Sequence, residues 1–141
     1  MLAENTVLTG RRAITRSYAK INLTLDVLSK RENGYHDIKM IMQTVSLFDL
    51  ILVDKTHRGI SISTNLPYLP CNEKNIAYKA ADAFFKATGI RGGAKIVIHK
   101  NIPVAAGLAG GSGNCAAVLT AMNMLHGNPL SNEELMHIGA S

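Results

Sequence analysis

Residues 101–113 read NIPVAAGLAGGSG, and this stretch decides how the chain is expected to fold. The run of Gly and Ala predicts a loop. Because these side chains are small, the backbone of such a loop can approach a ligand closely. Residues 115–125 follow and are apolar on nearly every face, which is typical of a buried helix. The free N–H groups and positive dipole end of such a helix bind anions, and phosphate is the usual occupant. A glycine-rich packing turn is the alternative.

Upstream of this loop, the sequence has the pattern of short strands. Residues 95–100 are predicted as a strand with Ile96 and Ile98 on one face. Further short strands are expected at residues 37–47, 50–54 and 60–63. A turn at 31–34 carries the Asn-Gly marker. The clearest alternation spans 19–27, where Ala19, Ile21, Leu23, Leu25 and Val27 alternate with Lys20, Asn22, Thr24 and Asp26.

Helices are predicted before and after the glycine-rich loop. Residues 74–88 carry apolar side chains at helical spacing, with Asn72 as the expected N-cap and Gly89 as the stop signal. Ser131 and Glu134 have the spacing of a capping box for a last helix. Strands come first and helices later, so the pattern predicts a β-meander with packed helices, an α+β fold.

Composition limits the classes of function. The chain has 141 residues, 47% of them hydrophobic, so we expect one domain over residues 1–141. A net charge of +5 suits phosphorylated ligands but also suits proteins without them. The chain has no Trp and no run of about five Lys or Arg, so no nucleic-acid partner is expected. It has no apolar run of about 18 residues and no apolar leader, so we expect no membrane segment and a cytoplasmic location.

Two familiar phosphate loops do not fit this stretch. A Walker A loop has Lys followed by Ser or Thr after its glycines, and this chain does not. Residues 111–116 match the GxGxxA of a dinucleotide fingerprint, with Glu133 about 20 residues further on. That fingerprint opens directly from a strand, whereas Pro103 and several other residues intervene here. The dinucleotide interpretation is therefore disfavoured.

The loop instead resembles the P-x-x-x-G-L-x-G-G-S motif of the GHMP kinases, a family of small-molecule kinases. The matching residues are Pro103, Gly107, Leu108, Gly110, Gly111 and Ser112. The resemblance implies the fold of the GHMP amino-terminal domain, which is of the ribosomal protein S5 domain 2-like type. It also implies ATP and Mg²⁺ as cofactors. The triphosphate would lie along the loop from Gly107 to Gly113, Ala109 included, with Ser112 near the metal.

Three more segments resemble one branch of this family, the kinases that act on 4-diphosphocytidyl-2-C-methyl-D-erythritol in non-mevalonate isoprenoid precursor synthesis. They are Ala19-Lys-Ile-Asn-Leu23, Gly34-Tyr-His36 and Asn75-Ile76. Over residues 17–141, the resemblance implies transfer of a phosphoryl group from ATP to a hydroxyl of that small molecule. The implied roles are catalysis for Lys20, substrate binding for Asn22, Tyr35 and His36, and contact with adenosine for Asn75 and Lys100.

The residues themselves are suited to these roles. Lys20 and Asn22 lie two apart in a strand, so both project from one face, and we expect them in the same cleft as the loop. A lysine near phosphates can neutralise charge on the transferred group. Tyr35 and His36 follow a turn, from which Tyr can stack on a base and His can bond its edge. Outside the motif, a solvated edge lysine and a capped turn with one packed aromatic are the alternatives.

The chain departs from the family pattern at two places. The family reads A-P-A-K where this chain has Ser17-Tyr-Ala-Lys20, and S-S-N or S-S-D where it has Ser112-Gly-Asn114. The second change removes one hydroxyl at the phosphate end, which is expected to bear on nucleotide affinity.

The expected catalytic base has no counterpart among these residues. The family places a G-[AS]-D-V segment with the basic Asp after the helix that begins here at Ser131, followed by a carboxy-terminal domain. The 141 residues alone are therefore expected to be inactive, and helix 115–125, short of covering neighbours, is expected to promote association. Two alternatives stay open. One is another GHMP kinase, acting on homoserine or mevalonate, against which residues 34–36 argue. The other is a non-catalytic, nucleotide-binding fragment.

Overall fold

The computed structural model describes residues 3–141, apart from the side chains of Thr24 and Leu25, so the faces predicted for those two residues lie outside the description. The elements in chain order are η1 (Ala3–Asn5), β1 (Thr6–Thr9), β2 (Arg12–Lys30), β3 (His36–Thr56), β4 (Gly59–Thr64), α1 (Ile76–Thr88), β5 (Gly93–His99), α2 (Gly110–Leu125) and α3 (Asn132–Ala140). The strands form one sheet in the order β1-β2-β3-β5-β4. The predicted α+β class is confirmed.

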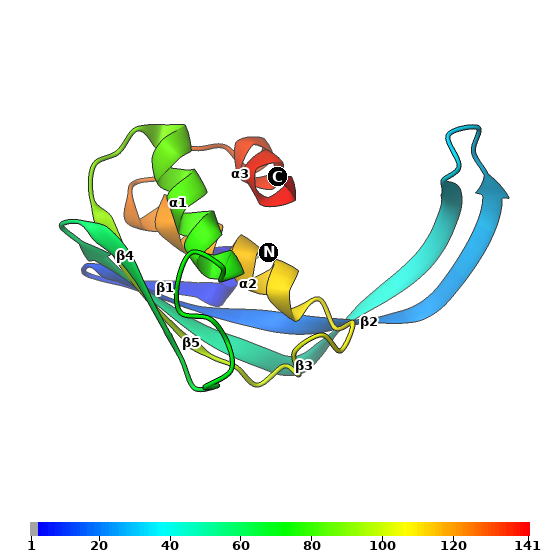
Figure 1. The fold of residues 1–141 in the computed structure, drawn as a ribbon, viewed down its shortest axis with the longest axis horizontal. Helices are drawn as coiled ribbons and strands as arrows, with labels where there is room; N and C mark the ends of the chain where they lie inside the picture. Colours follow the sequence, from blue (N-terminus) through cyan, green and yellow to red (C-terminus); the bar gives the residue numbers. More distant parts are fainter. Residues whose placement is uncertain (1–2) are drawn as a thin grey trace.

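The helices lie together on one side of the sheet (Figure 1). The core fills the space between the two layers. The strands contribute Ile51, Val53 and Ile96, and the helices contribute Phe84 and Val118. Burial of each of these side chains stabilises the fold by about 1.5–3 kcal/mol.

β1, β2 and β3 form the predicted antiparallel meander, but the prediction that its strands are short was wrong. β2 and β3 are long strands that pair antiparallel from Lys30 opposite His36 to Arg12 opposite Asp54. β3 runs straight through Asp49, where the sequence pattern indicated a break. β4 does not continue the meander either, because it pairs parallel with β5. α1 is the crossover between those two strands, which moves the chain to the helical layer and back.

Beyond the helices, β2 and β3 continue as a two-stranded ribbon that curves toward the helical side of the sheet (Figure 1). Register shifts between Tyr18 and Lys20, and between Asn22 and Thr24, interrupt the strict alternation predicted for this strand. Apolar side chains expected on a buried face are therefore exposed on the ribbon. Leu23 is 56% exposed, for example.

The exposed apolar surface was expected on helix 115–125, and this prediction was wrong. That helix, α2, contacts α1, α3, β2 and β3, and most of its side chains are buried. The exposed large apolar residues lie mainly on the ribbon instead: Leu23, Val27, Leu28, Tyr35, Ile38, Met40, Ile41 and Met42. The helices described are too short or too polar to cross a membrane.

The helix boundaries largely follow the predicted signals, with one correction. Gly89 ends α1 in the left-handed conformation, at φ 68°, and the predicted capping box starts α3. The N-cap of α1 is Asn75, whose side chain accepts from the N–H of Ala77, and not the predicted Asn72. Asn72 instead caps the turn before the helix, where its side chain accepts from the N–H of Lys74.

Candidate functional site

A cavity of about 500 Å³ opens above the glycine-rich loop. The loop forms one wall, and the start of α1 with the segment before it forms the other. Its lining residues are Leu69, Pro70, Lys74, Asn75, Ile76, Ile98, Lys100, Pro103 to Ser112, and Asn114. Asn75, Lys100, Pro103 and the loop from Gly107 to Ser112, widely separated in the sequence, are therefore brought together.

The start of α2 presents backbone donors to this cavity. The helix begins at Gly110, inside the glycine run that precedes the apolar residues 115–125. Its N-cap, Ala109, has φ 59° and no side-chain cap bond. The N–H of Gly113 donates to the carbonyl of Ala109 at 2.8 Å. The N–H groups of Gly110, Gly111 and Ser112, in the first turn of the helix, have no partner within the helix, so they are available to an anion.

The start of α1 meets the same cavity through Asn75 and Ile76. The Asn75 side chain is already engaged, because its Nδ2 donates to the Pro70 carbonyl at 2.8 Å and its Oδ1 accepts from Ala77 at 2.9 Å. Asn75 therefore shapes the wall of the cavity. Two helix amino termini thus face one space, and their dipoles both favour negative charge there.

Lys100 brings a cation to the wall. Its side chain is 6% exposed, and its ammonium forms an ion pair with Asp49 at 2.5 Å. A Cβ added at Gly110 would lie 3.4 Å from Lys100 Nζ, so the ammonium lies beside the first turn of α2. Sequence analysis missed Asp49. The available signal was a single acidic residue within the apolar run of residues 47–53.

Asn114 is a second residue that the sequence analysis missed. It lines the cavity and is 4% exposed, yet its Oδ1 has no hydrogen-bond partner among the described residues. A buried polar atom without a partner is costly, so this oxygen is an unsatisfied acceptor next to the cavity wall. The neighbouring Cys115 is a poor candidate nucleophile, because burial raises the pKa of its thiol.

Lys20 and Asn22 do not line this cavity, and both are exposed on β2. The strand nevertheless touches the loop, because the N–H of Lys20 donates to the carbonyl of Leu108 at 3.1 Å. The register shift at Ala19 frees that N–H from β3. The structure therefore places the Lys20 backbone beside the loop and leaves its side chain in solvent.

Tyr35 and His36 lie where the chain turns from β2 into β3, which is the far tip of the ribbon (Figure 1), and neither lines the loop cavity. The predicted turn precedes them, with Gly34 at φ 87° and its N–H donating to the carbonyl of Arg31. Tyr35 is 74% exposed.

Within the described residues, His, Cys, Asp and Glu side chains form no group of three that could hold a metal ion. Mg²⁺ that accompanies a nucleotide is bound mainly through phosphate oxygens and water, and it needs few protein ligands. The cavity thus has the donors for a polyphosphate and leaves the metal to the ligand and a hydroxyl such as that of Ser112.

Comparison with known proteins gives a consistent family. Residues 75–141 match the family profile described as "GHMP kinases N terminal domain". The chain is 49% identical over 128 residues to a protein of Clostridium kluyveri named 4-diphosphocytidyl-2-C-methyl-D-erythritol kinase, covering 91% of this chain and 46% of that protein. A protein of the same name from Caldicellulosiruptor saccharolyticus is 51% identical over 127 residues, covering 89% and 44%. The chain spans about half the length of the curated relatives it matches.

Solved structures agree with this match. A crystal structure of 4-(cytidine 5'-diphospho)-2C-methyl-D-erythritol kinase superposes with a TM-score of 0.79 at 34% identity, covering 91% of this chain and 46% of that one. Homoserine kinase from Cytophaga hutchinsonii superposes with a TM-score of 0.70 at 18% identity, covering 94% and 41%. The second match shows the fold alone.

Proposed function

Residues 75–141 match the N-terminal domain of the GHMP kinases, and from this premise we propose that residues 1–141 are the ATP-binding domain of such a kinase, with the nucleotide bound in the loop cavity. One observation carries the proposal. Two helix amino termini and the Lys100 ammonium meet at one cavity. All three favour negative charge there, which suits a polyphosphate.

The lining divides into two chemical halves. The N–H groups of Gly110, Gly111 and Ser112 would bind the triphosphate, and the Ser112 hydroxyl would complete the shell of a magnesium ion on it. Mg²⁺ would supply neutralisation of the charge that builds up on the phosphate oxygens. Leu69, Pro70 and Ile76 form an apolar wall, which suits an adenine ring.

The proposed reaction of the whole protein is transfer of the ATP γ-phosphoryl group to a hydroxyl of 4-diphosphocytidyl-2-C-methyl-D-erythritol, in isoprenoid precursor synthesis in the cytoplasm. Relatives named for this activity share 49–51% of their residues with the chain. Lys20 would stabilise charge at the reacting centre and Asn22 would position the acceptor. Tyr35 and His36 would hold the cytosine.

We propose that the acceptor side is completed by residues outside 1–141. The relatives are about twice as long as the part matched here. No Asp among the described residues 3–141 lines the loop cavity, so none of these can accept a hydroxyl proton there. A further domain would supply this base and face the ribbon that carries Tyr35 and His36.

Two experiments separate binding from catalysis. Calorimetric titration of residues 1–141 with MgATP tests the cavity, and absence of heat at millimolar nucleotide would contradict it. For catalysis, residues 1–141 are fused to the remaining carboxy-terminal half of the Clostridium kluyveri relative. ADP release by this chimera is then measured with the diphosphocytidyl substrate, homoserine and mevalonate.

We expect turnover by the chimera with the first substrate only, and none by residues 1–141 alone. Lys20→Met in the chimera should lower kcat at least 10²-fold and leave KM for ATP within a few-fold, because the lost charge acts in the transition state. Turnover with homoserine or mevalonate would favour the alternative GHMP kinases. Equal turnover by the chain alone would show that the base lies within residues 1–141.

A further inference from the structure

Asp49 is a buried acid that the proposed chemistry does not use. It lies in β3 between Phe48 and Leu50 and is 0% exposed. A buried carboxylate is strongly disfavoured unless donors satisfy it. The donors that satisfy this carboxylate therefore indicate which part of the chain it holds in place.

Each carboxylate oxygen of Asp49 is satisfied by the segment that leads into the loop. Oδ1 accepts from the N–H of Asn101 at 2.7 Å and from the N–H of Ile102 at 2.8 Å. Oδ2 accepts from Lys100 Nζ at 2.5 Å. The three donors come from consecutive residues, directly after β5 ends at His99. One side chain thus fixes the direction in which the chain leaves the sheet.

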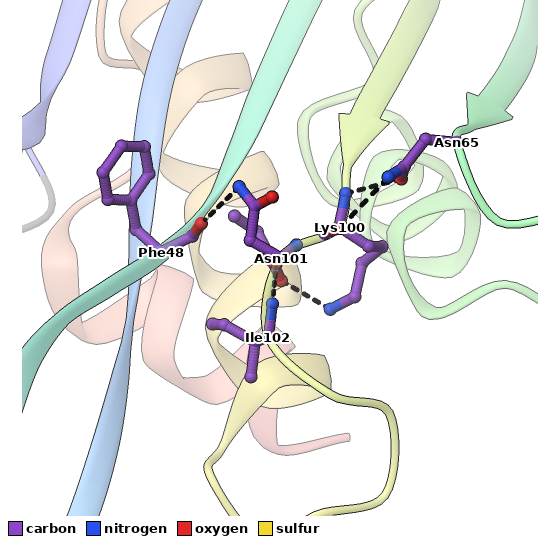
Figure 2. Close-up of polar contacts among 6 residues, drawn as sticks. Phe48, Asn65, Lys100, Asn101 and Ile102 are labelled. Carbon is purple, nitrogen blue, oxygen red and sulfur yellow. Dashed lines mark hydrogen bonds and ion pairs between the residues drawn. The ribbon is translucent and has the colours of Figure 1, made fainter.

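Other contacts hold the same segment (Figure 2). The Asn65 amide accepts from the Lys100 N–H at 2.7 Å and donates to the Lys100 carbonyl at 3.1 Å. The Asn101 side chain donates to the Phe48 carbonyl at 2.9 Å. Further along, the loop is attached to β2 through Leu108. The residues between Ile102 and Leu108 therefore span two fixed points.

The position of the Lys100 ammonium connects its ion pair with Asp49 to phosphate binding. The ammonium lies beside Gly110, at the positive end of the α2 dipole. A cation is unfavourable there unless an anion is also present. Asp49 supplies the compensating charge, and Lys100 is one of the residues that line the cavity. A phosphate bound at α2 would then meet both the helix N–H groups and a held cation.

We propose that Asp49 is the positioning residue of the phosphate site: it orients the Lys100 ammonium and anchors the entry of the glycine-rich loop, and so acts on nucleotide through both. The inference rests on the proposed ATP-binding function. Asp49 itself lies outside the cavity lining, so it does not touch the ligand.

The test compares Asp49→Asn with Asp54→Asn in residues 1–141. Asp54 lies on the same strand and pairs with Arg12 at 2.6 Å, away from the cavity, so its variant is the matched control. In Asp49→Asn an amide N–H faces the ammonium and the remaining acceptor is uncharged, so all three bonds weaken. Backbone hydrogen exchange and MgATP affinity are measured for both variants.

We expect Asp49→Asn to speed exchange of the N–H groups in 100–112 about tenfold or more, with α1 and β4 unchanged, and to raise the Kd for MgATP about tenfold or more. Asp54→Asn should change neither beyond about twofold. A purely structural role would speed exchange throughout the core. Unchanged exchange in 100–112 would overturn the proposal.

Two further outcomes are also decisive. If Asp49→Asn does not fold, the double variant Asp49→Asn, Lys100→Met removes both charges of the pair and keeps one acceptor for the loop. It should fold and bind MgATP about tenfold more weakly than the wild type, and binding within twofold of wild type would overturn the proposal. If the wild-type chain binds no MgATP, the proposed function fails, and the exchange comparison alone still decides the role of Asp49.

Discussion

Gly113 and Ser17 lie in direct contact, and a double-mutant cycle can test how closely α2 is seated on β2. A Cβ added at Gly113 would lie 2.6 Å from Ser17 Oγ, well inside van der Waals contact. Ser17 is 1% exposed, and its hydroxyl has no hydrogen-bond partner among the described residues. Two of the positions that depart from the expected family pattern, Ser17 and Gly113, are therefore neighbours. The strand carries a hydroxyl where that pattern has Ala, and the helix lacks one where the pattern has Ser.

The expected magnitude follows from two opposing effects. Overpacking a buried contact costs about 1–3 kcal/mol. Replacing Gly by Ala in a helix gains up to about 1 kcal/mol. We therefore expect Gly113→Ala to lower the free energy of unfolding by about 1–2 kcal/mol. Ser17→Ala removes the clashing atom and breaks no hydrogen bond of the structure, so the double variant should be at least as stable as the wild type.

Urea unfolding measures each free energy, with equal m-values as the check that the compared states are the same. Gly111→Ala is the matched control, because nothing lies within 4 Å of its added Cβ. It should leave stability unchanged or raise it by up to about 1 kcal/mol. Additive effects of Ser17→Ala and Gly113→Ala, within about 0.5 kcal/mol, would show that the contact does not limit the seating of α2.

Three further predictions concern single sites. Burial, reinforced by the charge of Lys55, lowers the pKa of His126, so the unfolded chain binds a proton at His126 more readily than the folded chain does. The free energy of unfolding should therefore be constant above about pH 6.5 and fall below it. The His126→Gln variant should flatten that fall in urea titrations from pH 5 to 8. Cys71 is exposed and Cys115 is buried with a raised pKa, so a disulfide reagent should label one thiol of the native chain quickly and the second only on unfolding; fast labelling of both would contradict the burial of Cys115. Ala109 has φ 59°, so Ala109→Gly should raise the free energy of unfolding by about 1 kcal/mol, and a loss on thermal or urea unfolding would count against strain at this cap.

The elements that the sequence predicted well are those with local signals. α2 follows a glycine run that precedes an apolar run, and α1 ends at a glycine in the left-handed conformation. The capping box at Ser131 is also local, since its two side chains are three residues apart. The choice between Asn72 and Asn75 could not be made locally, because both residues cap a turn and only one of those turns continues as a helix.

The features that the sequence did not predict depend on distant partners. Asp49 marked the end of a strand in the pattern, yet Lys100 compensates its charge and the strand continues. The ribbon appeared as separate short strands, because its apolar side chains follow no buried face once it leaves the helices. The loop motif indicated which residues share the cavity, but not that the Lys20 side chain stays outside it.

The pairing of β2 with β3 in the ribbon sets the register of the strands below the loop cavity. Its strands are neighbours in the chain, so pairing can close from the turn at 31–35 inward, each pair shortening the loop left for the next. Asp49 reaches its place opposite Ser17 only if this register is correct. A slip of one residue would turn the carboxylate to the open side of the sheet and bring Phe48 or Leu50 beneath the loop. Extra residues at the tip would therefore be harmless to nucleotide binding, whereas one extra residue in β3 beside Asp49 would abolish it.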